Sequence, residues 1–230
     1  DDRSAKKIMD NFFRNYPSNY RKNYDRNLKN IQIYRVDEYF DFDGSGATAK
    51  IYLKNDKIIL SNLENIIHEL MHMAHYDRKK DLLAISSKEL LWEDPLIEGA
   101  TEFLSSKAIG EPCAAYIFES FVVDMLSSID NFFEPFFIPN YKKFIKMFPC
   151  EKDILTLMYA LSFYYFYQDI EYENPNYDVV SKKLGEAIKT VINALISIES
   201  SIFRDETARD LYSEKFMDLI TSEFLEIHII

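Results

Sequence analysis

The chain has 230 residues, with 27 Lys and Arg against 38 Asp and Glu, so its formal net charge is −11 at pH 7. This acidity argues against nucleic acid or an anionic membrane as the main partner, because both carry negative charge. Hydrophobic residues make up 47% of the sequence and aromatic residues 15%, which indicates a folded protein with a sizeable core. The length fits a single domain of one or two lobes.

Three further features bear on the class of protein. The longest uncharged stretch, residues 154–168, is short and rich in tyrosine, so it predicts a buried helix rather than a membrane span. The sequence begins with Asp rather than Met, which indicates that its start was trimmed or processed. Cys113 and Cys150 could form one disulfide, although two buried thiols are the simpler interpretation. Compartment and oligomeric state stay open.

The first part of the chain predicts helices followed by a small sheet. Residues 4–15 carry an apolar stripe at helical spacing that ends before Pro17, and the polar residues 18–29 suit a second short helix. Residues 31–36, 47–54 and 57–60 are rich in β-formers, so we expect three strands there. The last of these strands leads directly into the next predicted helix.

That helix contains one His-Glu-x-x-His motif, in the segment Asn-Ile-Ile-His-Glu-Leu-Met-His-Met-Ala-His at residues 65–75. On a helix, His68 and His72 lie one turn apart on the same face, so both imidazoles can bind one metal ion. Glu69 lies on the flank of that face, where its carboxylate can reach a water on the metal. The other residues are mostly apolar, which predicts a buried helix. The alternative is a core helix whose histidines have other partners.

After about residue 78 the pattern is helical throughout. Asp94 before Pro95 predicts the start of a helix, and Gly110 predicts its end. We expect further helices at 114–129, 154–168, 179–198 and 206–227, with an irregular aromatic connection at 132–149. The predicted fold is therefore α+β, a single domain over residues 1–230. Its N-terminal lobe, about 1–78, holds the sheet, and its helical C-terminal lobe covers about 79–230.

The third metal ligand is expected in the segment Leu-Ile-Glu-Gly-Ala-Thr-Glu-Phe at residues 96–103, because a catalytic zinc site has three protein ligands and one open position. Glu98 and Glu102 are four apart on a helix. Glu98 can bind the metal, and Glu102 can accept the Nδ1–H of a metal-binding histidine. Gly99 would allow this helix to approach the histidine helix closely. The alternative is an amphipathic helix with two exposed glutamates.

His75, three residues beyond His72, is a candidate for a supporting or structural role. Three histidines in a row along one helix cannot converge on one ion without distortion. We therefore expect His75 to lie behind the metal ligands rather than among them.

The motif at residues 68–72, followed by Glu-Gly-Ala-Thr-Glu at 98–102, resembles the gluzincins, the thermolysin-like clan of zinc peptidases. The resemblance is above all to the catalytic domain of zinc aminopeptidases, whose third-ligand segment reads Trp-Leu-Asn-Glu-Gly-Phe-Ala. It covers roughly residues 47–167. It implies a zincin-like fold, a Zn²⁺ cofactor and hydrolysis of a peptide or protein substrate.

We expect zinc held by His68, His72 and Glu98 to lower the pKa of a bound water to about 7, and Glu69 to accept the proton of that water. The aminopeptidases also use a tyrosine from a downstream helix to stabilise the oxyanion, and Tyr159, in Met-Tyr-Ala-Leu-Ser-Phe, resembles it.

One departure from the aminopeptidases bears on specificity. They carry a Gly-Ala-Met-Glu-Asn segment whose Glu holds the α-amine of the substrate, whereas the corresponding residues 46–50 here contain no carboxylate. This favours an endopeptidase, or a narrow specificity, over a general aminopeptidase. We expect an extended substrate to lie along the strand at 47–53. Two alternatives remain: a zincin-fold binding or regulatory protein without turnover, and a helical structural protein without metal.

Overall fold

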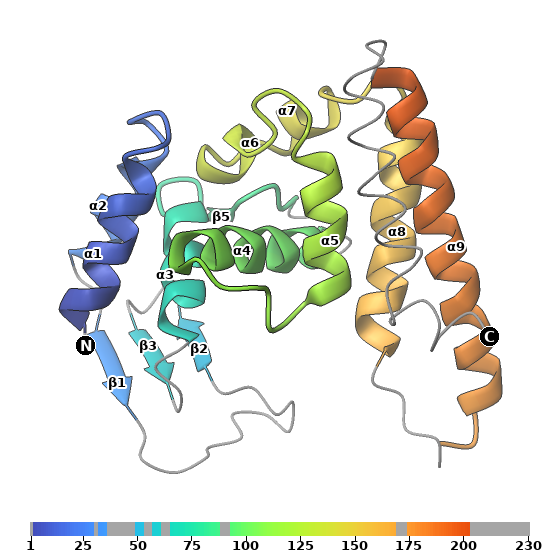
Figure 1. Cartoon of the computed structure of the whole chain (residues 1–230), viewed down its shortest axis with the longest axis horizontal. Coiled ribbons are helices and arrows are strands. Elements are labelled where there is room, and N and C mark those ends of the chain that lie inside the picture. Colours follow the sequence, from blue (N-terminus) through green and yellow to red (C-terminus); the bar gives the residue numbers. More distant parts are fainter. Residues whose placement is uncertain are drawn as a thin grey trace. The chain divides into compact units, whose positions relative to one another are not determined.

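The computed structural model describes residues 2–29, 32–35, 49–52, 57–60, 65–87, 93–168 and 174–202 (Figure 1). In this part of the chain, the α+β prediction is confirmed: helices dominate and the sheets are small. None of the described helices has the length and apolar character needed to span a membrane. The helix expected at 206–227 lies outside the described residues.

The described helices are α1 (Asp2–Phe13), α2 (Arg21–Leu28), α3 (Ile66–His75), α4 (Asp94–Ile109), α5 (Ile117–Leu126), α6 (Glu134–Phe137), α7 (Tyr141–Ile145), α8 (Glu151–Tyr167) and α9 (Tyr177–Ile202). The described strands are β1 (Gln32–Arg35), β2 (Ala49–Tyr52), β3 (Lys57–Leu60), β4 (Tyr76–Asp77) and β5 (Leu82–Leu83). The first three strands fall within the three predicted ranges.

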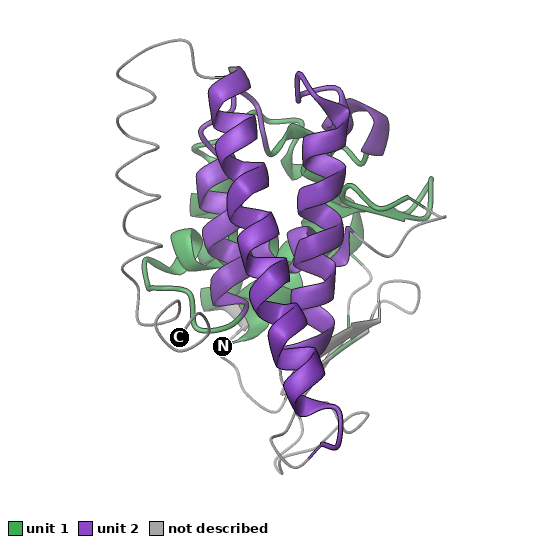
Figure 2. Cartoon of the chain, turned by 90° about the vertical axis from the view of Figure 1, so that its right-hand side faces the viewer, with its two compact units in different colours: residues 1–88, 101–115, 133–140 green, residues 89–100, 116–132, 141–230 purple. Residues whose placement is uncertain are grey.

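The chain forms two compact units that alternate along the sequence (Figure 2). Unit 1 consists of residues 1–88, 101–115 and 133–140, and unit 2 consists of residues 89–100, 116–132 and 141–230. Helix α4 belongs to both, because residues 94–100 fall in unit 2 and residues 101–109 in unit 1. The expected lobes, about 1–78 and 79–230, stay a prediction.

Unit 1 holds the three-stranded sheet, in the order β1-β3-β2. Strand β3 pairs in parallel with β1 and antiparallel with β2, and its Ile58 is fully buried. Strand β2, the expected substrate strand, is therefore at an edge of the described strands. Helix α3 contacts β2, so the sheet lies directly beside the helix that carries the His-Glu-x-x-His motif.

Within unit 1, helices α1 and α2 also pack against α3. The buried side chain of Asn27 on α2 donates hydrogen bonds to the carbonyl oxygens of Met73, at 2.8 Å, and of Tyr76, at 2.9 Å. The last carbonyls of a helix lack intrahelical partners. Asn27 therefore satisfies the C-terminal end of α3 and fixes it to α2.

The prediction of a purely helical chain after residue 78 is wrong at one place. Strands β4 and β5 form a two-residue antiparallel hairpin, with Tyr76 opposite Leu83. Asp81 and Ala84 adopt left-handed backbone conformations, with φ of 54° and 48°, and the Tyr76 hydroxyl donates to Asp81 Oδ1 at 2.8 Å. Strands this short leave no periodic pattern, and the turn contains no glycine to signal it. The aromatic connection at 132–149 also contains the short helices α6 and α7.

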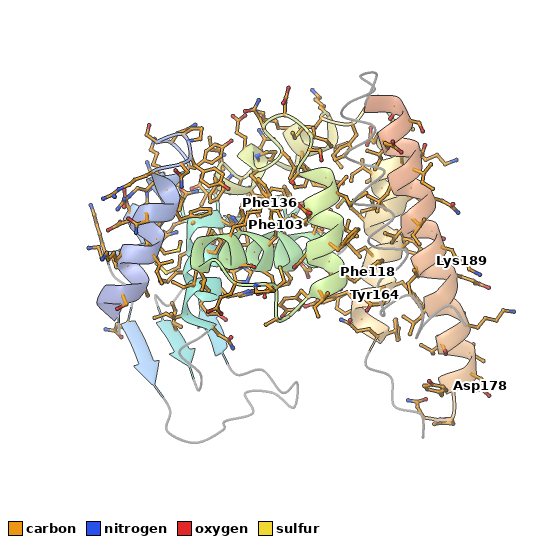
Figure 3. The ribbon with its side chains drawn as sticks, viewed as in Figure 1. Phe103, Phe118, Phe136, Tyr164, Asp178 and Lys189 are labelled. Carbon is orange, nitrogen blue, oxygen red and sulfur yellow. The ribbon has the colours of Figure 1, made fainter. Side chains whose placement is uncertain are left out.

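In unit 2, helices α8 and α9 run antiparallel and pack along their length (Figure 1). The buried side of α9 is a stripe at helical spacing, formed by Leu184, Ile188, Val191, Leu195 and Ile198. Asp178 and Lys189 point away from this stripe and are exposed (Figure 3). Phe118 of α5 meets Tyr164 of α8 edge to face, with ring centroids 4.7 Å apart (Figure 3), so α5 contacts α8.

Candidate metal centre

The two histidines of the motif bring one nitrogen each to the same point. On α3, the Nε2 atoms of His68 and His72 lie 3.2 Å apart. Two nitrogens bound to one tetrahedral zinc at 2.0–2.1 Å would lie about 3.3 Å apart. The four-residue spacing on the helix thus places the two imidazoles at a separation that suits one ion.

The other ring nitrogen of His68 is held by α4. His68 Nδ1 lies 3.0 Å from Glu102 Oε2, and an ionised carboxylate only accepts hydrogen bonds, so Nδ1 carries the hydrogen. Glu102 Oε1 accepts the backbone N–H groups of Ala114, at 2.9 Å, and Ala115, at 3.2 Å. Burial raises the pKa of Glu102, but the bonds from His68 and these two N–H groups outweigh it, and the pKa falls below its ordinary value. Glu102 is therefore a fixed anion that orients His68.

His72 has a different neighbour at its outer nitrogen. His72 Nδ1 lies 3.4 Å from the hydroxyl oxygen of Thr101, which is also 3.3 Å from Nδ1 of His75. The side chain of Thr101 is 0% exposed. Sequence reasoning did not identify this residue. The available signal was a β-branched hydroxyl residue inside the predicted helix, between two candidate glutamates, where its helix propensity is poor.

Glu98 completes the group. One ligand atom from each of His68, His72 and Glu98 lies within 4.8 Å of the others. Glu98 is one turn before Glu102 on α4, so the same helix supplies a third candidate ligand and the anion that orients a histidine. Two imidazole nitrogens and one carboxylate oxygen are the donor set of a catalytic zinc site, and they leave a tetrahedral position for a further ligand.

Gly99 allows a close helix approach, but the neighbour is not the one expected. A Cβ atom on Gly99 would lie 2.6 Å from the backbone carbonyl atoms of Glu119, which is on α5. The expectation that Gly99 faces the histidine helix is therefore wrong. The contact that needs a glycine is the one between α4 and α5, within unit 2. It holds the part of α4 that carries Glu98.

Glu69 and His75, the two other predicted site residues of α3, are both buried but lie in different surroundings. Glu69 is buried and follows His68 on the helix. His75 is fully buried outside the metal-binding group, with its ring 4.8 Å from that of Phe137 and 6.0 Å from that of Phe136. His75 thus joins the aromatic core of unit 1, and it also makes a polar contact with Thr101.

Tyr159, the expected oxyanion donor, lies on α8 and is 57% exposed. It lines two surface hollows together with other residues of α8 and α9. Tyr165, on the same helix, stacks on Tyr116 with ring centroids 5.9 Å apart. Burial raises the pKa of Tyr165 to about 12, and the negative charge of Glu98 adds to the rise. Glu98 is the largest of the charges that raise the pKa of Tyr165, and sequence reasoning did not single out this tyrosine.

Comparison with models of protein families, with curated proteins and with solved structures gave no match to this chain. The interpretation of the site therefore rests on its own residues. Cys113 and Cys150 are free thiols, but the expectation that both are buried is wrong, because Cys113 is half-buried and Cys150 is exposed. Neither is in the candidate metal-binding group of His68, His72 and Glu98.

Proposed function

We propose that this chain is a zinc-dependent peptidase in which His68, His72 and Glu98 hold the metal. One observation carries the proposal: the outer nitrogens of both histidines face partners on α4, Glu102 for His68 and Thr101 for His72. Both Nε2 atoms are thereby turned toward each other, next to Glu98. Partners that fix the outer nitrogen are typical of histidines that bind a metal.

Zinc bound at this position supplies Lewis acidity toward a water molecule and a peptide carbonyl. Glu69 acts as the general base, and it later returns the proton to the leaving amine. Its burial beside His68 keeps bulk water from competing for the carboxylate. Glu102 keeps His68 in the Nδ1–H form, so that its Nε2 atom stays a ligand.

The zincin-like fold belongs to the same proposal. A small sheet precedes the helix that carries the motif, and helices form most of the described remainder, which is the arrangement that the resemblance to gluzincins implies. Strand β2, at an edge of the described sheet, can receive an extended peptide through main-chain hydrogen bonds. Without a carboxylate at 46–50 to hold an α-amine, an endopeptidase or a narrow specificity is favoured over a general aminopeptidase.

The oxyanion donor is a tyrosine of α8 in this proposal. Tyr159 is the candidate from the motif resemblance. Tyr165 is a second candidate, because its pKa responds to Glu98 and its phenol stays protonated at neutral pH, as a hydrogen-bond donor must.

The test combines metal analysis with one substitution. Protein purified without added metal should contain zinc at a stoichiometry near one, and it should cleave members of an unbiased peptide library. Glu69→Gln keeps the size of the side chain and removes the base, so it should retain zinc and lose hydrolysis. Zinc without cleavage in the wild-type protein would instead support a binding or regulatory protein without turnover. Absence of zinc from the purified protein would contradict the proposal.

The assignment of the ligands has its own control. Glu98→Ala should abolish tight zinc binding, whereas Glu102→Ala should weaken it by about 10–100-fold, because Glu102 orients His68 without binding the metal. The reverse order would exchange the roles of the two glutamates.

A further inference from the structure

We propose that Thr101 is a positioning residue for the metal centre, and that it couples His72 to His75 through one hydroxyl group. The proposal rests on the proposed zinc site. Its basis is the pair of contacts of a single oxygen atom, 3.4 Å from His72 Nδ1 and 3.3 Å from His75 Nδ1. A residue three positions after a predicted ligand thereby connects the second motif histidine to the core.

The contact with His72 has a defined direction once a metal is bound. A neutral imidazole carries one hydrogen, and a ring that gives its Nε2 lone pair to zinc carries that hydrogen on Nδ1. His72 Nδ1 then donates to the hydroxyl oxygen of Thr101. Since Thr101 is buried, and its β-branched side chain is restricted in χ1, the hydroxyl can accept this hydrogen bond and fix the plane of the His72 ring.

His75 restrains the hydroxyl from its other side. The imidazole is fully buried and packs edge to face on Phe137, with an interplanar angle of 67°. Core side chains of this kind occupy single rotamers in close packing. The position of Thr101 Oγ1 is therefore defined by a rigid neighbour, and His75 acts on the metal centre through Thr101 without touching the metal.

The two motif histidines thus have unlike supports. A charged carboxylate holds His68, while a neutral hydroxyl holds His72. Charge-assisted hydrogen bonds are roughly twice as strong as neutral ones. Loss of the Thr101 hydroxyl should therefore weaken zinc binding less than loss of the Glu102 carboxylate.

The experiment uses the full chain, with zinc alone as the probe. Zinc affinity is measured by competition with a chromogenic chelator, and the geometry of the site by the visible absorption of the Co²⁺-substituted protein. Thr101→Val has nearly the same shape but no hydroxyl, and it should weaken zinc binding by about tenfold and alter the Co²⁺ spectrum. Thr101→Ser keeps the hydroxyl and should restore both properties to near the wild-type values.

Ser105→Ala is the matched control. Ser105 is one turn further along α4, is buried, and donates its hydroxyl to the backbone carbonyl of Thr101 at 2.6 Å. Its removal deletes a buried hydroxyl from the same helix without touching either histidine. It should leave zinc affinity and the Co²⁺ spectrum unchanged, even where it lowers the melting temperature of the metal-free protein.

His75→Phe tests the third member and serves if Thr101→Val does not fold. It should weaken zinc binding in the same direction as Thr101→Val and by a smaller factor. Wild-type zinc affinity and an unchanged Co²⁺ spectrum in Thr101→Val, or in His75→Phe if only that variant folds, would overturn the inference while leaving the proposed function intact. A wild-type protein that binds no zinc would overturn both.

Discussion

A methyl group on Gly99 would lie 2.6 Å from both the carbonyl carbon and the carbonyl oxygen of Glu119. Real Cβ atoms do not approach backbone atoms so closely, and neither atom belongs to a flexible side-chain end, so α4 and α5 would have to separate. We predict that Gly99→Ala lowers the free energy of unfolding by at least about 2 kcal/mol, as for an overpacked core site. Urea unfolding measures this change.

Gly110→Ala is the comparison for Gly99→Ala. Gly110 follows α4, has φ of 85°, and has open space where a Cβ would stand. Its substitution should cost only about 1 kcal/mol, because the strain comes from the left-handed backbone and not from a collision. Equal costs for the two variants would mean that the contact between α4 and α5 relaxes easily. The zinc affinity of Gly99→Ala should also fall, because Glu98 is the adjacent residue.

The contacts of the Glu102 carboxylate use both of its oxygen atoms. One oxygen faces His68 Nδ1 and the other accepts two backbone N–H groups. In Glu102→Gln, one oxygen becomes an NH₂ group that faces donors. We predict a loss of about 30-fold in zinc affinity, larger than that for Thr101→Val and measured by chelator competition. Glu111→Gln, an exposed substitution in the segment that follows α4, should leave the affinity unchanged, and a similar loss there would point to a general effect of net charge.

Two tyrosines of α8 can be separated by their phenylalanine variants. Tyr165 interacts electrostatically with Glu98, whereas Tyr159 is largely exposed. We predict that Tyr165→Phe lowers kcat for peptide hydrolysis by about 100-fold and leaves zinc affinity unchanged, because a donor to the oxyanion acts in the transition state. Tyr159→Phe should change kcat little. The opposite result would assign the role to Tyr159, as the motif resemblance suggests.

The local spacing of residues explains why the group of His68, His72 and Glu98 could be predicted. His68 and His72 are four apart, as are Glu98 and Glu102, and the geometry of a helix fixes what that spacing places on one face. The strands before α3 could also be predicted from the sequence, since β-formers cluster in short runs with turns between them. These features depend on neighbours in sequence.

The features that sequence reasoning missed depend on contacts between distant segments. Gly99 indicated a close approach between helices, but only the folded structure shows that the neighbour is Glu119. Thr101 resembles an ordinary helix residue until His72 and His75 lie beside it. Tyr159 and Tyr165 are alike in a tyrosine-rich sequence, and it takes the folded structure to show that Tyr159 is exposed and that Tyr165 packs on Tyr116 and senses the charge of Glu98.

The stability of the metal-free protein should depend on pH through Asp94, the first residue of α4. Burial, and then the charges of Glu93 and Glu98, raise the pKa of Asp94 from its ordinary 3.8 to about 6. The folded state therefore binds this proton more tightly than the unfolded state. By linkage, the free energy of unfolding falls as pH rises from about 4 to about 6, and the full penalty remains at higher pH.

Asp94→Asn removes the charge and keeps a side chain that suits the start of a helix. We predict that it stabilises the metal-free protein at pH 7.5 by on the order of 1 kcal/mol, after allowance for solvent screening, and by less at pH 4.5. For a chain of this length the gain corresponds to about 2–4 °C in melting temperature. Asp178→Asn, at an exposed position in the first turn of α9, is the control. A gain that is the same at both pH values would show that the charge of Asp94 is not its source.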